Sequence, residues 1–121
     1  MSIKGRHLLI LEDEPIVGLA LEDMIADAGG RSIYAEYLEQ AIELIAVEPL
    51  DGAILDVNVH GEKSYTVAHM LTQVGVPFIF ATGYGDSLHP AEFKEVPTVT
   101  KPYGLSDIEK ALGFVFASPV R

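Results

Sequence analysis

Short apolar runs alternate along this chain with longer segments in which apolar residues recur at helical spacing. Strands are predicted for the short runs, at 8–11, 31–37, 53–56, 78–81 and 96–100. The segment 31–37 alternates only weakly and is expected near an edge of the sheet. Helices are predicted for the longer segments: 15–28, 38–47, 64–74, 84–94 and 104–115. The alternation predicts an α/β fold of five β/α units, a three-layer sandwich with a parallel sheet in the middle.

The predicted helices differ in the strength of their signals. Pro15 stands at the first position of the first helix, and Ser64 is a predicted N-cap of the third. The apolar repeat of the first helix consists of Ile16, Leu19, Ala20, Met24 and Ala28. Segment 84–94 is the weakest helix because it contains Gly85 and Pro90, and we expect it to be short and mobile.

Residues with chemical function follow four of the predicted strands. Glu12 and Asp13 come after the first strand, Asp56 ends the third, Thr82 follows the fourth and Lys101 follows the fifth. In an open parallel sheet, binding sites form at the carboxyl ends of the strands. We therefore expect these side chains to meet at one edge of the sheet.

Composition narrows the class of protein. A chain of 121 residues is expected to be one domain, 1–121, with no room for an output domain. No cysteine is present, which excludes disulfides and thiolate metal sites, and no apolar run is long enough for a signal peptide or membrane span. A cytoplasmic protein is expected. The net charge of −10 opposes binding to a phosphate backbone, so direct DNA binding is not expected.

The acids at this edge predict a metal-assisted reaction. Three carboxylates, from Glu12, Asp13 and Asp56, repel one another unless a cation lies between them, and Mg²⁺ prefers oxygen ligands of this kind. A carboxylate beside such a metal can attack phosphorus and form an acyl phosphate. Thr82 and Lys101 would supply a hydroxyl and an ammonium to the transferred oxygens. Dinucleotide binding is disfavoured, because acids and not a Gly-x-Gly-x-x-Gly motif follow the first strand.

These motifs resemble those of one family, the receiver domains of two-component response regulators. Their order and spacing along the whole chain are similar to the family's acidic pair, phosphoacceptor, hydroxyl and lysine motifs, which here are Glu12-Asp13-Glu14-Pro15, Ile54-Leu55-Asp56, Thr82 and Lys101-Pro102. The string Phe80-Ala81-Thr82-Gly83-Tyr84 is similar to that of the receiver subgroup nicknamed "FAT GUY".

The resemblance implies a fold and a set of roles. The fold would be flavodoxin-like, with sheet order 2-1-3-4-5. Asp56 would be phosphorylated by a histidine kinase or a phosphotransfer protein. Asp13, Asp56 and the main-chain carbonyl of Asn58 would hold Mg²⁺, and Glu12 would bind it through water. Phosphorylation would change the binding of an unidentified downstream protein, and the family implies loss of the phosphoryl group by self-catalysed hydrolysis.

Two positions depart from the usual receiver pattern. Val59-His60 stands where a Met-Pro pair is usual, and Thr98 stands where many receivers carry a switch aromatic. An aromatic residue instead follows the hydroxyl motif, at Tyr84. We hypothesise that Thr82 and the glycine-flanked Tyr84 segment provide the switch when the phosphoryl group arrives. His60 lies in the loop of the site, where a solvated loop histidine is the simpler interpretation.

Other functions remain open at this stage. One is a phosphatase of the haloacid dehalogenase type, although its nucleophile follows the first strand and Asn58 lacks the acidic proton of that family's second aspartate. Another is a pseudo-receiver, a constitutive binding module with the same fold. A homodimer through the face of the last helix is compatible with the pattern, which does not require it.

Overall fold

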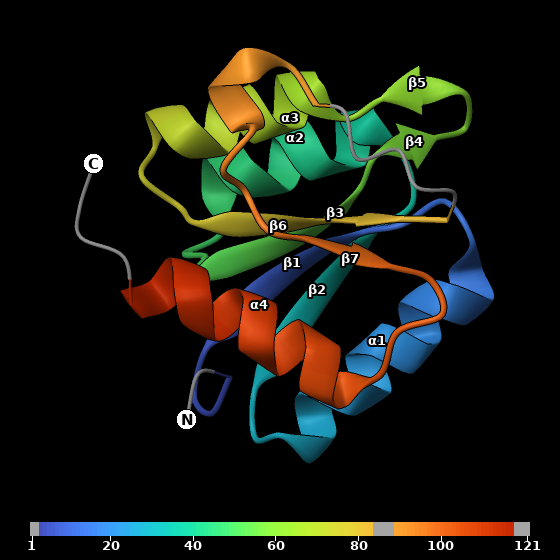
Figure 1. Ribbon diagram of the computed structural model, residues 1–121, viewed down its shortest axis with the longest axis vertical. Coiled ribbons are helices and arrows are strands. Elements are labelled where there is room, and N and C mark those ends of the chain that lie inside the picture. The colour runs from blue at the N-terminus through green and yellow to red at the C-terminus, as the bar shows by residue number, and fades with distance from the viewer. Residues whose placement is uncertain (1–2, 84–88, 118–121) are drawn as a thin grey trace.

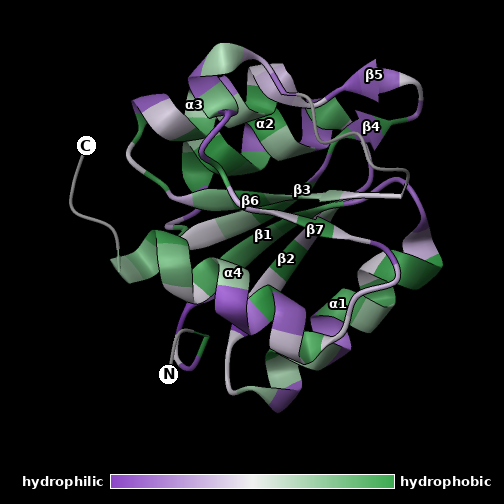
Figure 2. Ribbon diagram, in the orientation of Figure 1, coloured by the Kyte–Doolittle hydropathy of each residue, from purple (hydrophilic) through white to green (hydrophobic). Residues whose placement is uncertain are grey.

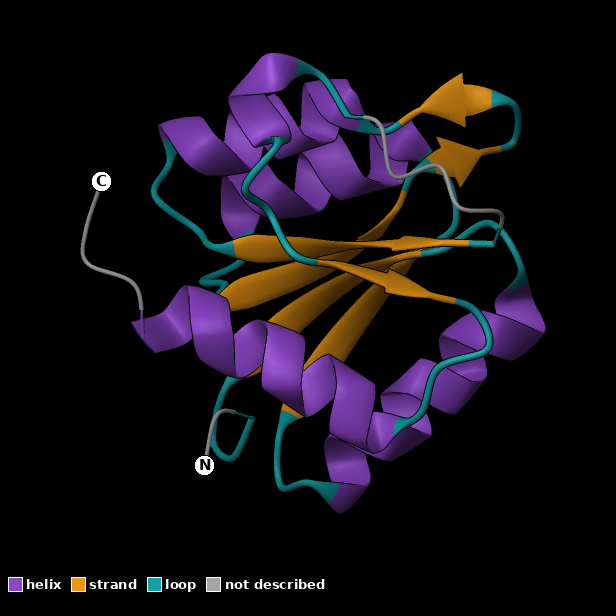
Figure 3. Cartoon of the chain, viewed as in Figure 1, coloured by secondary structure: helices purple, strands orange, loops and turns teal. Residues whose placement is uncertain are grey.

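The computed structural model describes residues 3–83 and 89–117, which form a five-stranded parallel sheet with helices on both faces (Figure 1; Figure 3). The strands are β1 (His7–Leu11), β2 (Arg31–Ala35), β3 (Gly52–Asp56), β6 (Phe78–Thr82) and β7 (Thr98–Thr100). The helices are α1 (Pro15–Asp27), α2 (Leu38–Val47), α3 (Tyr65–Gln73) and α4 (Leu105–Ala117). The strand order is β2-β1-β3-β6-β7, so the predicted flavodoxin-like sheet of order 2-1-3-4-5 is confirmed.

Two hydrophobic clusters hold the layers together, one on each face of the sheet. Successive residues of a strand point to opposite faces. Leu9 and Leu11 of β1 therefore join the cluster under α2 and α3, while Leu8 and Ile10 join the cluster under α1 and α4. Both faces of the central strands are buried, and polar chemistry is confined to the ends of the strands.

The predicted apolar repeat of α1 only partly marks the side that packs on the sheet, because Met24 and Ala28 contact the core but Ile16 and Leu19 are exposed. Ile16 and Leu19 are 84% and 62% exposed, whereas Gly18 and Leu21 are buried. A Cβ at position 18 would lie 2.5 Å from Cε1 of Tyr34, so the glycine allows the helix to approach β2. The outward side of α1 is also apolar, and Figure 2 shows hydrophobic colour at the start of this helix. None of the helices in the described part is long and apolar enough to cross a bilayer.

The connection between β6 and β7 differs from the predicted helix at 84–94. Residues 84–88 lie outside the described part of the chain, and the rest holds one 3₁₀ turn, η1 (Ala91–Phe93). The turn begins after Pro90, and its Phe93 is buried and stacks on Tyr65 of α3 with ring centroids 5.9 Å apart. His89 also contacts this region, through hydrogen bonds with Tyr65 and Thr98. The prediction of an α-helix is wrong for 89–94.

A small hairpin follows β3 where the sequence predicted only a loop. Its strands are β4 (Asn58–Val59) and β5 (Glu62–Lys63), joined by His60 and Gly61 with φ of 50° and 83°. Positive φ at both central residues is what a type I′ turn requires. Ser64 then stands at the N-cap position of α3, but its hydroxyl is buried and has no hydrogen-bond partner among the described residues. The predicted N-cap position of Ser64 is therefore confirmed, but its side chain makes no capping hydrogen bond.

Candidate functional site at the carboxyl edge of the sheet

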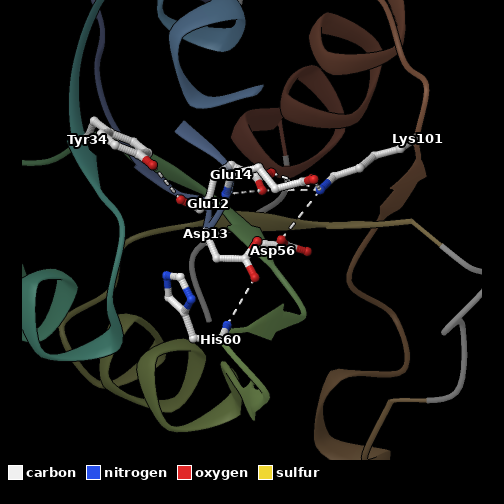
Figure 4. Close-up of polar contacts among 7 residues, drawn as sticks. All are labelled: Glu12, Asp13, Glu14, Tyr34, Asp56, His60 and Lys101. Carbon is white, nitrogen blue, oxygen red and sulfur yellow. Dashed lines mark hydrogen bonds and ion pairs between the residues drawn. The ribbon is translucent and has the colours of Figure 1, made fainter. Parts of the chain in front are cut away.

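The sheet register brings the acidic residues to one place. Leu11 of β1 pairs with Leu55 of β3, so the next residues along the two strands, Glu12 and Asp56, are neighbours. Glu12 is 1% exposed and Asp56 is 5% exposed. One carboxylate oxygen from each of Glu12, Asp13 and Asp56 lies within 4.8 Å of the other two (Figure 4). This group is the acid cluster.

Lys101 closes the acid cluster from the side of β7. Its Nζ lies 3.0 Å from Glu12 Oε1 and 3.4 Å from Asp56 Oδ2. Its backbone N–H donates to the carbonyl of Thr82 at 2.8 Å, and the peptide bond to Pro102 is cis. The lysine therefore forms the only cationic side of a cluster that is otherwise negative, within the part of the chain that the structure describes.

Burial and mutual repulsion control the protonation of the cluster. Burial raises the pKa of Asp56 to about 8, and the charge of Glu12 adds to this rise while Lys101 opposes it. Burial also raises the pKa of Glu12, although Lys101 works against it. Burial alone would lower the pKa of Lys101, but its bond to Glu12 and the charge of Asp56 outweigh that and raise it. Without a further cation, burial and mutual repulsion therefore favour protonation of the Asp56–Glu12 pair.

Asp13 has a different environment on the opposite side. Its Oδ2 accepts a hydrogen bond of 3.0 Å from the backbone N–H of His60, in the turn of the β4–β5 hairpin (Figure 4). Burial would raise the pKa of Asp13, but this bond, together with those to Asp56 and Glu12, lowers it below the ordinary value of 3.8. Asp13 is therefore the member of the cluster whose charged form the fold favours.

Three residues that the sequence did not single out also border the cluster. Tyr34 donates its hydroxyl to the Glu12 carbonyl at 2.7 Å, and Glu14 places Oε1 3.4 Å from Lys101 Nζ. The Tyr103 hydroxyl is buried, with no hydrogen-bond partner among the described residues. Burial and the charge of Glu12 raise its pKa. Position next to a strand-end motif was the available signal for Glu14 and Tyr103, whereas Tyr34 is recognised only from the pairing of β2 with β1.

The remaining predicted site residues lie around the cluster or outside the description. Thr82 is 3% exposed at the end of β6, where it pairs with Thr100 just before Lys101. Asn58 is exposed in β4, two residues after Asp56. Tyr84 lies outside the described residues. The structure thus brings Glu12, Asp13, Asp56 and Lys101 together, with Thr82 at the adjoining strand end.

Comparison with solved structures identifies the family, although no family model matches the chain. SdrG from Sphingomonas melonis Fr1 is 33% identical over 97% of this chain and 100% of its own, with a TM-score of 0.81. The receiver (REC) domain of the response regulator PhyR from Erythrobacter litoralis is 27% identical over 100% and 99% of the two chains, with a TM-score of 0.78. This chain belongs to the response regulator receiver domains.

Two further matches show how this receiver domain compares with longer or more distant proteins. The receiver domain of a sensor histidine kinase from Pseudomonas aeruginosa PAO1, which holds magnesium in its active-site cleft, shares the fold at 20% identity and a TM-score of 0.80, over 94% and 99% of the chains. Sensory transduction protein LytR from Staphylococcus haemolyticus is 28% identical over 112 residues, which are 88% of this chain and 44% of LytR. The receiver domain therefore spans less than half of that curated relative.

Family membership places the chain in two-component signalling. Receiver domains are phosphoacceptors that interact with histidine kinases or phosphotransfer proteins, and they are not enzymes in the usual sense. The alternative of a haloacid dehalogenase-type phosphatase is thereby removed. A pseudo-receiver would have the same fold but would not be phosphorylated. Phosphorylation of Asp56 therefore distinguishes the two alternatives.

The acid cluster of this receiver domain fits a hard divalent cation. All its ligand atoms are carboxylate oxygens, and they converge within 4.8 Å. The raised pKa of Asp56 shows that Lys101 alone does not neutralise the cluster. An ion with two positive charges would supply what is missing, and Glu12, Asp13 and Asp56 could hold it.

Proposed function

We propose that this receiver domain accepts a phosphoryl group on Asp56 from a histidine kinase or a phosphotransfer protein, with Mg²⁺ as cofactor. One observation carries the proposal. Asp56 is a buried carboxylate at a strand end, flanked by two further acids and by the ammonium of Lys101. A pocket with this charge pattern is suited to accept a cation and a phosphoryl anion together.

The resemblance to other receiver domains suggests the ligands of the cation. Asp13 and Asp56 would bind Mg²⁺ directly, together with the main-chain carbonyl of Asn58, and Glu12 would act through water. Bound Mg²⁺ would keep Asp56 ionised and neutralise charge on the phosphoryl oxygens. The buried Glu12 is already paired with Lys101 at 3.0 Å, which supports an indirect role for Glu12.

The transfer needs little from the protein beyond position and charge. A carboxylate oxygen of Asp56 forms the new bond to phosphorus as the bond between phosphorus and the donor's imidazole nitrogen breaks. The nitrogen keeps the electron pair and takes up a proton from solvent. Lys101, already 3.4 Å from Asp56, would turn toward the phosphoryl oxygens, and the Thr82 hydroxyl would donate a hydrogen bond to them.

The surface beside the pocket supports a protein as phosphodonor. Ile16, 84% exposed, lines an apolar groove of about 460 Å³ between α1 and the segment after β7, where Lys101 and Tyr103 complete the wall. A large apolar surface next to a charged site is typical of protein recognition. Net charge of −10 supports a role without direct DNA contact, and we place the exchange in the cytoplasm.

The output would be a change of shape at the face formed by Thr82, Tyr84 and Lys101. Movement of Thr82 and Lys101 toward the phosphoryl group would rearrange the segment after β6 and alter the binding of a downstream protein. Substitution Tyr84→Ala tests this output. If a phosphate mimic changes partner binding equally in both proteins, Tyr84 is not the switch. If the output is instead a homodimer through the α4 face, phosphorylation should double the molecular mass of the particle in solution.

Intact mass spectrometry tests the central proposal. The protein is incubated with Mg²⁺ and acetyl phosphate or phosphoramidate, and the wild type is compared with Asp56→Asn. We expect one phosphoryl adduct in the wild type, none in Asp56→Asn and none when a chelator is present. Asp23→Asn, an exposed acid on α1, is the matched control and should be modified like the wild type.

The same experiment identifies a pseudo-receiver. A wild type that stays unmodified by both donors, and by a histidine kinase with ATP, would contradict phosphorylation and favour a constitutive binding module. Loss of the adduct that is faster in the folded protein with Mg²⁺ than in denatured protein would demonstrate self-catalysed hydrolysis.

A further inference from the structure

The turn of the β4–β5 hairpin is docked on the corner between β2 and α2. The ring of His60 stacks on that of Tyr37, with centroids 4.4 Å apart and an interplanar angle of 17°. Its Nε2 lies 3.2 Å from Oε2 of Glu36, a hydrogen bond that the carboxylate accepts. The His60 ring is therefore held by two neighbouring residues of another loop. In Figure 4 only the backbone N–H of His60, and not its ring, is joined to the acid cluster by a dashed line.

That corner is itself fixed by a side chain of α2. Oε1 of Gln40 accepts hydrogen bonds from the backbone N–H groups of Glu36 and Tyr37, at 2.8 Å and 3.0 Å. Gln40 stands at the N3 position of α2, so the corner is tied to the first turn of a helix. The ring of Tyr37 is consequently a stable surface for His60 to rest on.

The docked ring determines where the backbone of His60 points. His60 has φ of 50°, the single positive value outside glycine among the described residues, and this conformation needs support from its surroundings. In it, the backbone N–H donates to Oδ2 of Asp13 at 3.0 Å. The stack on Tyr37 and the hydrogen bond to Glu36 supply that support. Because they hold the backbone of His60 in this conformation, they also hold its hydrogen bond to Asp13.

We propose that His60 is a positioning residue that, held by Tyr37 and Glu36, presents Asp13 to the cation through a single oxygen. The inference builds on the proposed function, because it concerns the same magnesium site. Because Oδ2 already accepts the N–H of His60, Oδ1 is the oxygen better placed to bind the metal. A carboxylate that offers one oxygen suits the octahedral shell of Mg²⁺, whereas Ca²⁺ accepts bidentate carboxylates. The hairpin therefore favours Mg²⁺ over Ca²⁺.

Cation binding to the unphosphorylated protein tests this role. Dissociation constants for Mg²⁺ and Ca²⁺ are measured by calorimetry for the wild type, His60→Gly and Tyr37→Ala. His60→Gly keeps the N–H and tolerates positive φ but lacks the ring. We expect about tenfold weaker Mg²⁺ binding in both variants, the usual scale for a residue that orients a metal ligand, with a smaller change for Ca²⁺. Selectivity for Mg²⁺ should therefore fall.

Two controls separate positioning from general structure. Tyr37→Phe keeps the stacking ring and should bind Mg²⁺ like the wild type. His69→Ala removes an exposed histidine of α3, 3.4 Å from Glu92, and should leave both constants unchanged. Thermal melts show whether each variant is folded. If Tyr37→Ala does not fold, His60→Gly alone tests the positioning role.

The outcomes distinguish this inference from the proposed function. Unchanged Mg²⁺ affinity and selectivity in a folded His60→Gly would overturn the positioning role while leaving the phosphoacceptor proposal intact. A wild type that binds no Mg²⁺ would overturn both. The role is supported if His60→Gly and Tyr37→Ala bind Mg²⁺ more weakly and with lower selectivity over Ca²⁺, while Tyr37→Phe binds both ions like the wild type.

Discussion

The two sides of the acid cluster act by different physical means. On the Lys101 side, an ammonium lies within 3.0–3.4 Å of carboxylates, and the contacts are between charges. On the His60 side, a neutral backbone N–H meets Asp13, and an aromatic stack holds it there. A charge shifts its neighbours' pKa values over several ångströms, whereas a backbone donor fixes the direction of one oxygen. The first side therefore sets the charge of the pocket, and the second sets its geometry.

Replacement of Lys101 should have the largest effect. Lys101→Met leaves the buried Glu12 without its cation, and loss of one partner of a buried pair typically costs about 3–5 kcal/mol. The lysine is 19% exposed and the acids can take up protons, so we expect about 2–3 kcal/mol less stability near neutral pH. Urea unfolding without divalent ions measures it.

Lys110→Met provides the matched control for this loss, because Lys110 is exposed on α4. Its effect should stay within about 0.5 kcal/mol. Equal stabilities of the two methionine variants would show that charge is not what organises the Lys101 side.

The second largest effect is expected in the pH dependence of stability, which should differ between the Lys101 side and the His60 side of the acid cluster. Because folding raises the pKa of Asp56 from 3.8 to about 8, the protonated carboxyl favours the folded state. This contribution is complete below the ordinary pKa and is lost as the pH rises through about 8. In EDTA, the wild type should lose stability between about pH 5.5 and about pH 8.5, and Asp56→Asn should lose less.

Asp13 should behave in the opposite way, because folding lowers its pKa. Its contribution is present above the ordinary value of 3.8 and is lost as the pH falls through its folded pKa. Asp13→Asn should therefore flatten the stability curve only at acidic pH. Identical curves for the two asparagine variants would contradict the distinction between the sides.

The smallest effects are expected at two buried hydroxyls, one on each side. Tyr103, near Lys101, and Ser64, just after the hairpin, have hydroxyls without partners among the described residues. Removing an unsatisfied buried hydroxyl relieves its desolvation cost, so Tyr103→Phe and Ser64→Ala should each change stability by less than about 1 kcal/mol, in the stabilising direction. A clear loss in urea unfolding would show that the hydroxyl has a partner, such as an ordered water.

Much of the fold and the meeting of the acids could be predicted from local sequence. Strands buried on both faces are continuous apolar runs, so their ends at Asp56 and Thr82 were easy to locate. Parallel order then brings the strand ends together, whatever the details of packing. α2 agrees with its predicted range, Leu38–Val47, because its apolar repeat stops before Pro49.

Other features depend on contacts that no local pattern contains. α1 is apolar on two sides, and the choice between them depends on Tyr34 of β2 meeting Gly18. The hairpin has only two residues in each strand, too few for an alternating pattern, and the turn signal was the pair His60-Gly61. The support of His60 by Tyr37 links residues far apart in sequence, so the sequence offered no sign of it.

The outward face of α1 also affects how copies of this protein meet. Ile16 and Leu19 are exposed on a molecule with net charge −10, so two molecules repel each other before their apolar faces touch. Dissolved salt shortens the reach of this repulsion to about 8 Å at physiological ionic strength. Low-salt solutions therefore strengthen the repulsion between copies, whereas positive charge around an apolar surface would be attracted to this face.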